Sequence, residues 1–426
     1  MIAILFGTLI VMLLIGVPIA ICLLIAVSFT MLSMGNVDLF PAIAQRMFTQ
    51  ADNFTLMAIP FFILAGELMG KGGISKRLIS FMQLCIRNVP ASLAGITTVS
   101  SAFFGAISGS NPATVAAIGG ITVPRMIEKG YDKGTAAAVA AASGTLGVVI
   151  PPSIPMVTYA IVASVSVGTM FLAGIVPGIL LALTVCIVNI FVCGKYDNEK
   201  TTKKVTSKEF LQIFLDASFA LMMPVIILGG IYSGFFTPTE AATVSCVYAL
   251  VVSMFIYKEL KVSDLPAIFV KSAISSGVIL FVVSCSAPFG WLMTSEGIPS
   301  IIANTILNVF TNKFAILFAM NLVLLFFGCL LETQAIILLM SPILLPIAAS
   351  LGLSPIALGI IMIINTSIGM ITPPMAVNLF VAGGIARVSL EEVSKKVVPF
   401  FIAEVILLLI LTYFPDVITF LPNLMQ

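Results

Sequence analysis

The 426-residue chain contains no histidine and a single tryptophan. The lack of histidine excludes Ser-His triads and haem or zinc sites that need an imidazole ligand. No GxxxxGK[ST] segment is present, so the chain does not hydrolyse ATP through a Walker motif. The seven cysteines are scattered without CxxC spacing, which favours buried apolar packing over metal binding. These absences make an enzyme the least favoured class.

Charge is also scarce, because only 9% of the residues are charged while 60% are hydrophobic. Soluble domains carry about 25% charged residues. We therefore expect an integral protein of the lipid bilayer without a sizeable soluble domain. A net charge of +2 and the lack of a basic-aromatic pattern argue against a nucleic-acid partner.

An internal repeat organises the chain. The segment GVVIPP at 147–152 returns as GMITPP at 369–374, at an offset of 222 positions. The same offset relates Pro124 to Pro346, Gly130 to Gly352 and Pro177 to Pro399, whereas FFG at 103–105 returns at 326–328 with an offset of 223. Each proline pair interrupts an apolar segment that otherwise reads as a membrane helix. A duplicated membrane protein with a broken helix in each half is typical of secondary transporters.

The pattern predicts an all-α polytopic membrane protein made of two inverted-topology repeats. The first repeat covers 1–194, with a re-entrant hairpin at about 92–130 and a broken helix at about 134–165. A polar cytoplasmic linker follows at 195–210. The second repeat covers 211–426, with a hairpin at about 314–352 and a broken helix at about 354–387. In the second repeat we also expect an amphipathic stretch near 262–273, followed by a span at 274–294.

The basic residues give the orientation. If both predicted hairpins enter and leave on one side, all 20 Lys and Arg residues except Arg46 and Lys313 lie on a single face. The positive-inside rule makes that face cytoplasmic. Full double-pass spans would hardly change the count, so the bias supports the topology without proving re-entrancy. The two hairpins then open from opposite sides, which makes the halves inverted.

The N-terminal apolar run at 1–34 is too long for one average span of about 20 residues. We favour two short helices folded at Gly16-Val17-Pro18, with a periplasmic N-terminus. One long tilted helix with an internal N-terminus is the alternative. No Lys or Arg precedes Arg46, so the charge rule does not decide between them. Because the run lacks a basic region and an A-x-A site, we expect no cleaved signal peptide.

Polar islands in the apolar hairpins are the candidate sites. The first hairpin carries SGSNP at 108–112, where glycine and proline free backbone carbonyls from the helical ladder. Hydroxyls, an amide and free carbonyls are hard oxygen ligands of the kind that Na⁺ prefers. The second hairpin carries ETQ at 332–334 at the matching place. A tight polar turn at the interface is the alternative reading.

The broken helices supply the other half of each site. A half-helix that begins at Pro152-Ser153 would point its positive end at the break and would suit a carboxylate. A proline kink used only for packing is the alternative. The polar residues near the two breaks are Ser143, Thr145 and Ser153 in the first copy, and Asn365, Thr366, Ser367, Thr372 and Asn378 in the second.

Four glutamates lie in or beside apolar spans, where a buried charge costs about 3 kcal/mol. They are Glu67, Glu240, Glu332 and Glu404. Glu332 is the best functional candidate because of its hairpin position. Glu240 is alternatively a helix cap, and Glu67 and Glu404 are alternatively paired with other helices. Apart from Lys271, no Lys or Arg lies deep in the spans, so a substrate carboxylate would be met by Na⁺, hydroxyls and helix ends.

Several motifs together resemble a known family. They are GELM (66–69), SGSNPATVAAIG (108–119), GVVIPPSIP (147–155), AGIVPG (173–178), TPTEAA (237–242) and MITPPMAVNLF (370–380). These segments resemble the large membrane subunit of TRAP (tripartite ATP-independent periplasmic) transporters. The resemblance implies Na⁺-coupled import of an organic acid across the bacterial inner membrane by an elevator mechanism, in which a transport domain slides against a scaffold. It also implies a separate small four-helix membrane subunit, a periplasmic substrate-binding protein and no organic cofactor.

The resemblance further implies site residues. The first Na⁺ site would use Ser108, Ser110 and Asn111 with backbone near Gly147 and Pro151, and the second would use Thr333 and Gln334 with backbone near Gly369 and Pro373. The substrate would lie between the two tips, near Ser153, Ser108, Asn378 and Asn111.

Other functions stay open. A binding-protein-independent Na⁺/carboxylate symporter of related architecture is the main alternative, and a passive channel would need a continuous polar stripe that the chain does not show. The substrate also stays open among C4-dicarboxylates, sialic acid and other sugar acids.

Overall fold

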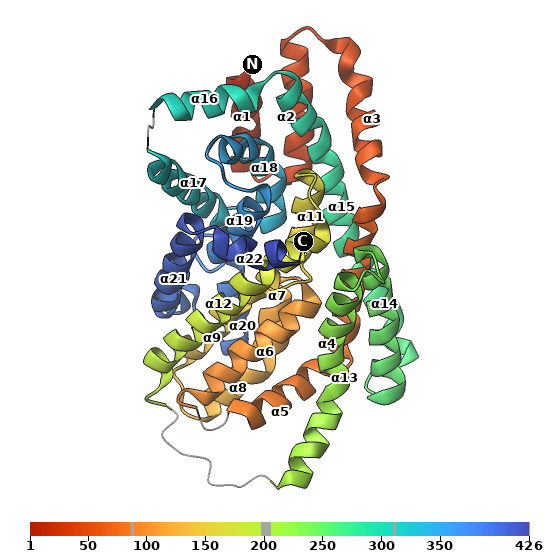
Figure 1. Cartoon of the computed structure of the whole chain (residues 1–426), viewed down its shortest axis with the longest axis vertical. Helices are drawn as coiled ribbons and strands as arrows, with labels where there is room; N and C mark the ends of the chain where they lie inside the picture. Colours follow the sequence, from red (N-terminus) through yellow and green to blue (C-terminus); the bar gives the residue numbers. More distant parts are fainter. Residues whose placement is uncertain (87–88, 197–205, 310–311, 426) are drawn as a thin grey trace.

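The computed structural model describes residues 1–86, 89–196, 206–309 and 312–425, and within these ranges the regular structure is helical, without strands (Figure 1). Seven of the described helices are long and apolar enough to cross a membrane, or eight if one bent helix pair is counted as a span. The predicted all-α polytopic class is therefore confirmed.

The N-terminal run forms two helices, as expected. Helix α1 (Ile2–Leu14) packs on α2 (Ile19–Ser33). The turn between them uses Gly16 at φ +85°, a left-handed conformation that favours glycine, and Pro18 precedes α2. In Figure 1 the N-terminus lies at the opposite end of the molecule from the start of α13 (Ser207–Tyr232).

One group of helices consists of α1 and α2 with α3 (Phe40–Ala51), α4 (Ala58–Lys71), α13, α14 (Pro238–Val251) and α15 (Leu265–Ser295). The amphipathic stretch expected near 262–273 and the span expected at 274–294 form one continuous helix. After a short 3-10 turn, Val262–Asp264, the chain continues as the single helix α15. Pro266 occupies the first turn of this helix, where a proline interrupts no hydrogen bond, and no glycine follows until Gly277.

Two of the intramembrane glutamates have local structural partners. Glu67 on α4 forms a 2.7 Å ion pair with Lys271 on α15. Glu240 forms a capping box with Thr237 at the start of α14. These contacts confirm the pairing and capping alternatives for Glu67 and Glu240.

The second group of helices contains the hairpins and broken helices. The first hairpin runs through α6 (Ser92–Ser108), α7 (Asn111–Thr114), a π-helical turn (Val115–Gly119) and α8 (Gly120–Glu128). The first broken helix consists of α9 (Lys133–Gly144), α10 (Leu146–Val149) and α11 (Ile154–Val162), and it bends by 42° at the break.

The second repeat has the same order. Its hairpin is α17 (Lys313–Gly328) and α18 (Thr333–Ser350), and its broken helix is α19 (Pro355–Gly369) and α20 (Val377–Ala386). The long helices α12 (Val167–Cys193) and α21 (Leu390–Tyr413) follow the two breaks. The remaining helices are α5 (Ile74–Ile86), α16 (Ile298–Val309) and α22 (Asp416–Leu424).

The predicted linker at 195–210 falls largely on residues 197–205, which lie outside the described residues. The described end of that range, from Ser207, is already the first turn of α13.

The inverted repeat is visible in single hydrogen bonds. The Asn189 amide on α12 donates to the Thr98 hydroxyl on α6 at 2.8 Å. In the second half the Asn321 amide on α17 donates to the Thr412 hydroxyl on α21 at 3.0 Å. Both pairs are 91 positions apart, and asparagine and threonine have exchanged helices. Each hairpin is thus fastened to the long helix of its own half by the same bond.

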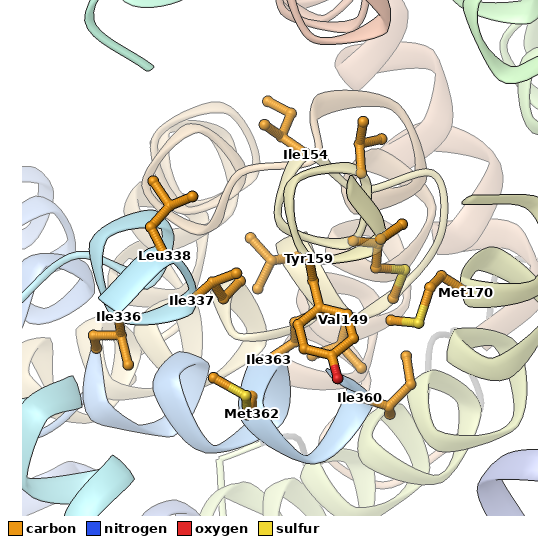
Figure 2. Packing of buried hydrophobic residues seen from close by; sticks show 14 of the residues in the cluster. Val149, Ile154, Tyr159, Met170, Ile336, Ile337, Leu338, Ile360, Met362 and Ile363 are labelled. Carbon is orange, nitrogen blue, oxygen red and sulfur yellow. The ribbon is translucent and has the colours of Figure 1, made fainter. Parts of the chain in front are cut away.

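The core joins the two halves around Tyr159 on α11 (Figure 2). Its ring lies among residues of α18 and α19, including Ile337 and Ile363. The phenol donates a 2.6 Å bond to the carbonyl of Pro355. A Cβ on Gly359 would lie 2.3 Å from the Tyr159 ring, so a glycine is needed to admit it. The second half of the first broken helix, α11, is therefore anchored in the second repeat.

Candidate functional site

Pairs of glycines bring each hairpin onto its broken helix. A Cβ on Gly105 of α6 would lie 2.9 Å from the Cα of Gly147 in α10. In the second half a Cβ on Gly369 would lie 2.4 Å from the carbonyl carbon of Gly328. Real Cβ atoms do not approach backbone so closely, so both contacts require glycine. In each half, the FFG motif and the GxxxPP motif therefore meet in one close backbone contact.

Several oxygen atoms of the first tip lie close to Gly147. The hydroxyls of Ser108 and Thr114 lie 2.9 Å apart, and Thr114 donates a 2.8 Å bond to the carbonyl of Ser110. That carbonyl oxygen lies 2.6 Å from where a Cβ on Gly147 would be. The structure thus brings Ser108, Ser110 and Gly147 together as expected, with Ser110 contributing its carbonyl.

Thr114 was missed by the sequence reasoning. It follows Ser110 by four positions, so one helical turn returns its hydroxyl to the tip. That spacing is the signal that could have found it.

Asn111 reaches from the first tip into the second repeat. Its side chain is fully buried, and its amide nitrogen donates a 2.7 Å bond to the hydroxyl of Ser367 on α19. The Asn111 Oδ1 atom has no hydrogen-bond partner among the described residues. Ser153 is also buried with an unpartnered hydroxyl, and Gly109 of the tip packs against it and Ile154. The tip and the first break therefore face each other, as predicted.

The second tip is built differently. Thr333 and Gln334 begin α18 with buried side chains, and the Gln334 Oε1 atom has no partner among the described residues. The carbonyl of Cys329 accepts a 3.1 Å bond from the amide of Met375, which ties the tip to the second break. Glu332 caps α18 with its backbone only, and its side chain is exposed. The structure therefore separates Glu332 from its buried neighbours.

Met370 lies between the two hairpin tips. Its sulfur contacts the Asn111 amide nitrogen at 3.4 Å and the Thr333 hydroxyl at 3.6 Å. The two tips thus meet at the second break. Sequence reasoning missed Met370, because a methionine in an apolar segment reads as ordinary core.

Asn378 lies close to the first tip, because a Cβ on Gly144 would meet both its amide nitrogen at 3.3 Å and the Asn111 carbonyl oxygen at 3.5 Å. It is fully buried on α20 and donates a 3.2 Å bond to the carbonyl of Ala141 on α9, while its Oδ1 atom has no partner among the described residues. Two of the predicted residues take no visible part in the tips. Pro151 is buried and Pro373 is exposed, and no hydrogen bond joins either to a hairpin tip in the described ranges.

Together these residues present buried oxygen atoms without donors. They are the side-chain oxygens of Asn111, Ser153, Gln334 and Asn378. Buried polar atoms are usually partnered, so these four oxygens at the tips and breaks are free to accept bonds from a ligand. Neutral oxygens suit hard cations such as Na⁺ and polar groups of a substrate. Within the described residues no three His, Cys, Asp or Glu side chains gather as metal ligands.

Comparison with known proteins gives the family. The family profile described as "Tripartite ATP-independent periplasmic transporter, DctM component" matches residues 6–417. The chain belongs to this family. It is therefore a TRAP transporter large permease component and a multi-pass membrane protein, as the sequence motifs indicated.

Relatives of this TRAP permease are similar along most of their length. A C4-dicarboxylate TRAP transporter large permease protein of Pseudomonas aeruginosa is 39% identical over 91% of this chain and 90% of its own. A sialic acid TRAP transporter large permease protein of Vibrio cholerae is 34% identical, covering 96% and 95%. An isethionate TRAP transporter permease protein of Oleidesulfovibrio alaskensis is 42% identical over 97% of this chain, which spans 65% of that protein.

Two solved structures share the fold. The YdaH transporter of Alcanivorax borkumensis has a TM-score of 0.65 at 13% identity, covering 90% of this chain and 89% of its own. MtrF of Neisseria gonorrhoeae has a TM-score of 0.56 at 13% identity, covering 89% and 85%. At this identity the likeness concerns the fold alone.

Proposed function

We propose that this permease component imports a small organic acid, coupled to Na⁺, after delivery by a periplasmic substrate-binding protein. The observation that carries the proposal is the meeting of the two hairpin tips at Met370, with donor-free oxygens of Asn111 and Gln334 beside it. Free carbonyls and amide oxygens at broken helices are the arrangement in which secondary transporters hold coupling ions.

We propose two Na⁺ sites at the hairpin tips. The first uses the hydroxyls of Ser108 and Thr114, the Ser110 carbonyl and the Asn111 side chain above Gly147. The second uses Thr333 and Gln334 with the backbone near Gly369. The substrate lies between these tips, against Ser153 and Asn378.

The substrate class rests on the relatives. Their names give C4-dicarboxylate, sialic acid and isethionate, all of which are acids. A carboxylate or sulfonate group is the feature they share. We therefore propose an organic acid of this class, without choosing among them.

The two helix groups support an elevator mechanism. The hairpins, broken helices, α12 and α21 form one group, which moves against the scaffold of α1–α4 and α13–α15. The small four-helix subunit joins the scaffold, and the binding protein docks on the outer face. The excess of basic residues on the opposite face sets the orientation in the bacterial inner membrane.

Uptake into proteoliposomes tests the proposal. The chain is reconstituted with its small subunit and binding protein, and radiolabelled succinate, N-acetylneuraminate and isethionate are offered with an inward Na⁺ gradient. We expect one acid to accumulate only with Na⁺ and the binding protein. Accumulation without the binding protein would favour the binding-protein-independent symporter, and accumulation without Na⁺ would overturn the coupling.

A variant connects this assay to the site. Asn111→Ala removes the buried amide and should reduce Na⁺-driven uptake at least tenfold. Asn36→Ala removes an exposed asparagine that makes no side-chain cap bond and should leave uptake unchanged.

A further inference from the structure

A hollow of about 570 Å³ lies away from the hairpin tips, where the two helix groups face each other. Its scaffold wall comes from α3, the end of α15 and the start of α16, and its other wall comes from α11 and α18. In Figure 1 these elements gather in the half of the molecule that contains the N-terminus, opposite the start of α13. By the charge rule this is the outer half.

Arg46 is the charged residue that lines this hollow. Its guanidinium lies 5.4 Å from the ring centre of Trp291 on α15, which is cation-π distance. No carboxylate lies within ion-pair distance of Arg46 in the described part of the chain. Arg46 is exposed, and its contact with the ring leaves its hydrogen-bond donors available for an anion.

The other residues that line the hollow form one polar wall and one apolar wall. The scaffold wall is polar around Arg46, with the side chains of Thr49, Gln50, Ser286, Thr294 and Ser300. The wall from α18 is apolar, with Leu338, Pro342, Leu345 and Pro346. A molecule with one acidic end and a short carbon body matches both walls.

We propose that this hollow is a second anion-binding site, where the carboxylate or sulfonate of an incoming acid pairs with Arg46 before it reaches the hairpin tips. The inference rests on the proposed function, because it takes the transported acid as the ligand. Arg46 and Lys313 are the basic residues expected on the outer face. A guanidinium can donate two hydrogen bonds to two oxygens of one acid group, which the neutral oxygens between the tips do not offer.

The geometry also fits a transit role. The apolar wall belongs to α18, whose first residues, Thr333 and Gln334, form the second tip. An acid held on Arg46 therefore rests against the helix that leads to the proposed transport site. A neighbouring hollow of about 580 Å³ shares Ile161 and Ser164 with this one.

The single tryptophan of the chain reports on the proposed site. The large subunit is purified with its small subunit in dodecyl maltoside, with any tryptophans of the small subunit replaced. Trp291 fluorescence is then followed while succinate or isethionate is added. We expect a saturable change that is about tenfold or more weaker in Arg46→Gln, because one charge-assisted bidentate pair is lost. Arg46→Lys should fall in between.

Matched controls separate this site from the transport site. Lys313→Gln removes the other outer basic residue, which does not line the hollow, and should leave the titration unchanged. Asn111→Ala should abolish uptake while keeping the Trp291 signal. In proteoliposomes Arg46→Gln should raise the KM for delivered acid without lowering the maximal rate to a similar extent.

The possible outcomes decide the proposal. An unchanged titration in Arg46→Gln, or a signal lost in Asn111→Ala, would overturn the second site without affecting the proposed function. A signal produced only by added phosphatidylglycerol would make the hollow a lipid site and would also overturn it. Failure of uptake in the unmodified complex, with the Trp291 titration intact, would instead count against the proposed transport function.

Discussion

The hydroxyl of Ser367 donates a 2.7 Å hydrogen bond to the carbonyl of Thr145, 222 positions earlier in the chain. This offset equals the offset of the internal repeat, so each of the two residues is the other's repeat equivalent. A residue contacts its own equivalent only beside the axis that relates the two halves. The axis therefore passes between the broken helices, and the hydrogen bond from Asn111 to Ser367 places the candidate site on it.

Ser367→Ala should impair the site more than the loss of one small hydroxyl group suggests. The change leaves the buried Asn111 amide without its 2.7 Å acceptor and removes the bond to Thr145. Buried unpaired polar groups cost about 1–3 kcal/mol each. We expect a lower midpoint of thermal unfolding and at least tenfold slower Na⁺-driven uptake.

Ser80→Ala is the matched control for this substitution. Its exposed hydroxyl bonds only to the carbonyl of Lys76 in its own helix, so neither quantity should move. Equal effects of the two substitutions would show that the bond across the axis contributes nothing special.

Substitution of the glycines beneath the tips should be poorly tolerated. In Gly147→Ala the new methyl group would meet the Ser110 carbonyl oxygen at 2.6 Å, and in Gly369→Ala it would meet Gly328 backbone at 2.4 Å. Backbone on both sides leaves little room to relax, and overpacking costs about 1–3 kcal/mol. We expect both variants to lose most uptake, measured per amount of folded protein from size-exclusion chromatography.

Gly384→Ala serves as the control, because a Cβ there would meet nothing within 4 Å. This variant should keep its uptake and should gain slightly in helix stability. Normal uptake in Gly147→Ala would mean that the first tip does not need its close approach to α10.

Much of this site could be predicted from the sequence, because the residues that shape it act on the local backbone. Glycine and proline set backbone geometry wherever they occur, so the GxxxPP breaks and the SGSNP tip are readable without the fold. Met370 could not be found in this way. Its role depends on which chain segments meet, and methionine is common in apolar helices.

The surroundings of other candidates also depend on the fold. Glu332 is a candidate because a carboxylate in an apolar block is costly, and the structure places it at the cap of α18, next to the buried side chains of Thr333 and Gln334. The stretch near 262–273 and the span at 274–294 form one helix because a change from an amphipathic to an apolar pattern does not end a helix. A backbone feature such as Gly16 does end one, and there the expected division is correct.

We predict that replacing the Glu404 carboxyl with a neutral amide does not destabilise the protein. The side chain is fully buried on α21, where one oxygen accepts a 3.2 Å bond from Thr145 and the other has no partner in the described ranges. Glu404→Gln keeps the shape and the acceptor and removes a carboxyl whose ionisation would cost about 3 kcal/mol in a span. We expect an unchanged or higher unfolding midpoint at pH 7.

Two comparisons make the Glu404 result interpretable. Glu391→Gln, on the exposed start of the same helix, should change the midpoint little, because its ion pair with Lys395 is exposed. A clear loss of stability in Glu404→Gln would contradict the expectation and would mean that the ionised form has an unseen cationic partner.

Asp132 should make stability depend on pH at the start of α9. Its carboxylate accepts bonds from the Thr135 amide at 3.0 Å and hydroxyl at 2.9 Å, and it pairs with Lys396 at 3.2 Å. Partial burial works to raise the pKa of Asp132, but these bonds and the lysine charge outweigh it and hold the pKa below its usual value. That value is about 3.9 in unfolded chains.

Because the folded pKa is the lower one, the contribution to stability is present above about pH 4 and is lost as the pH falls through the folded pKa. Asp132→Ala should therefore cost about 1 kcal/mol at pH 7, the usual value of a lost N-cap. The difference from wild type should shrink below pH 4, as measured by thermal unfolding in detergent. Asp52→Ala, an exposed residue at the end of α3, should show no difference at either pH. A difference for Asp132→Ala that stays constant down to pH 3 would mean that the cap does not depend on the ionised carboxylate.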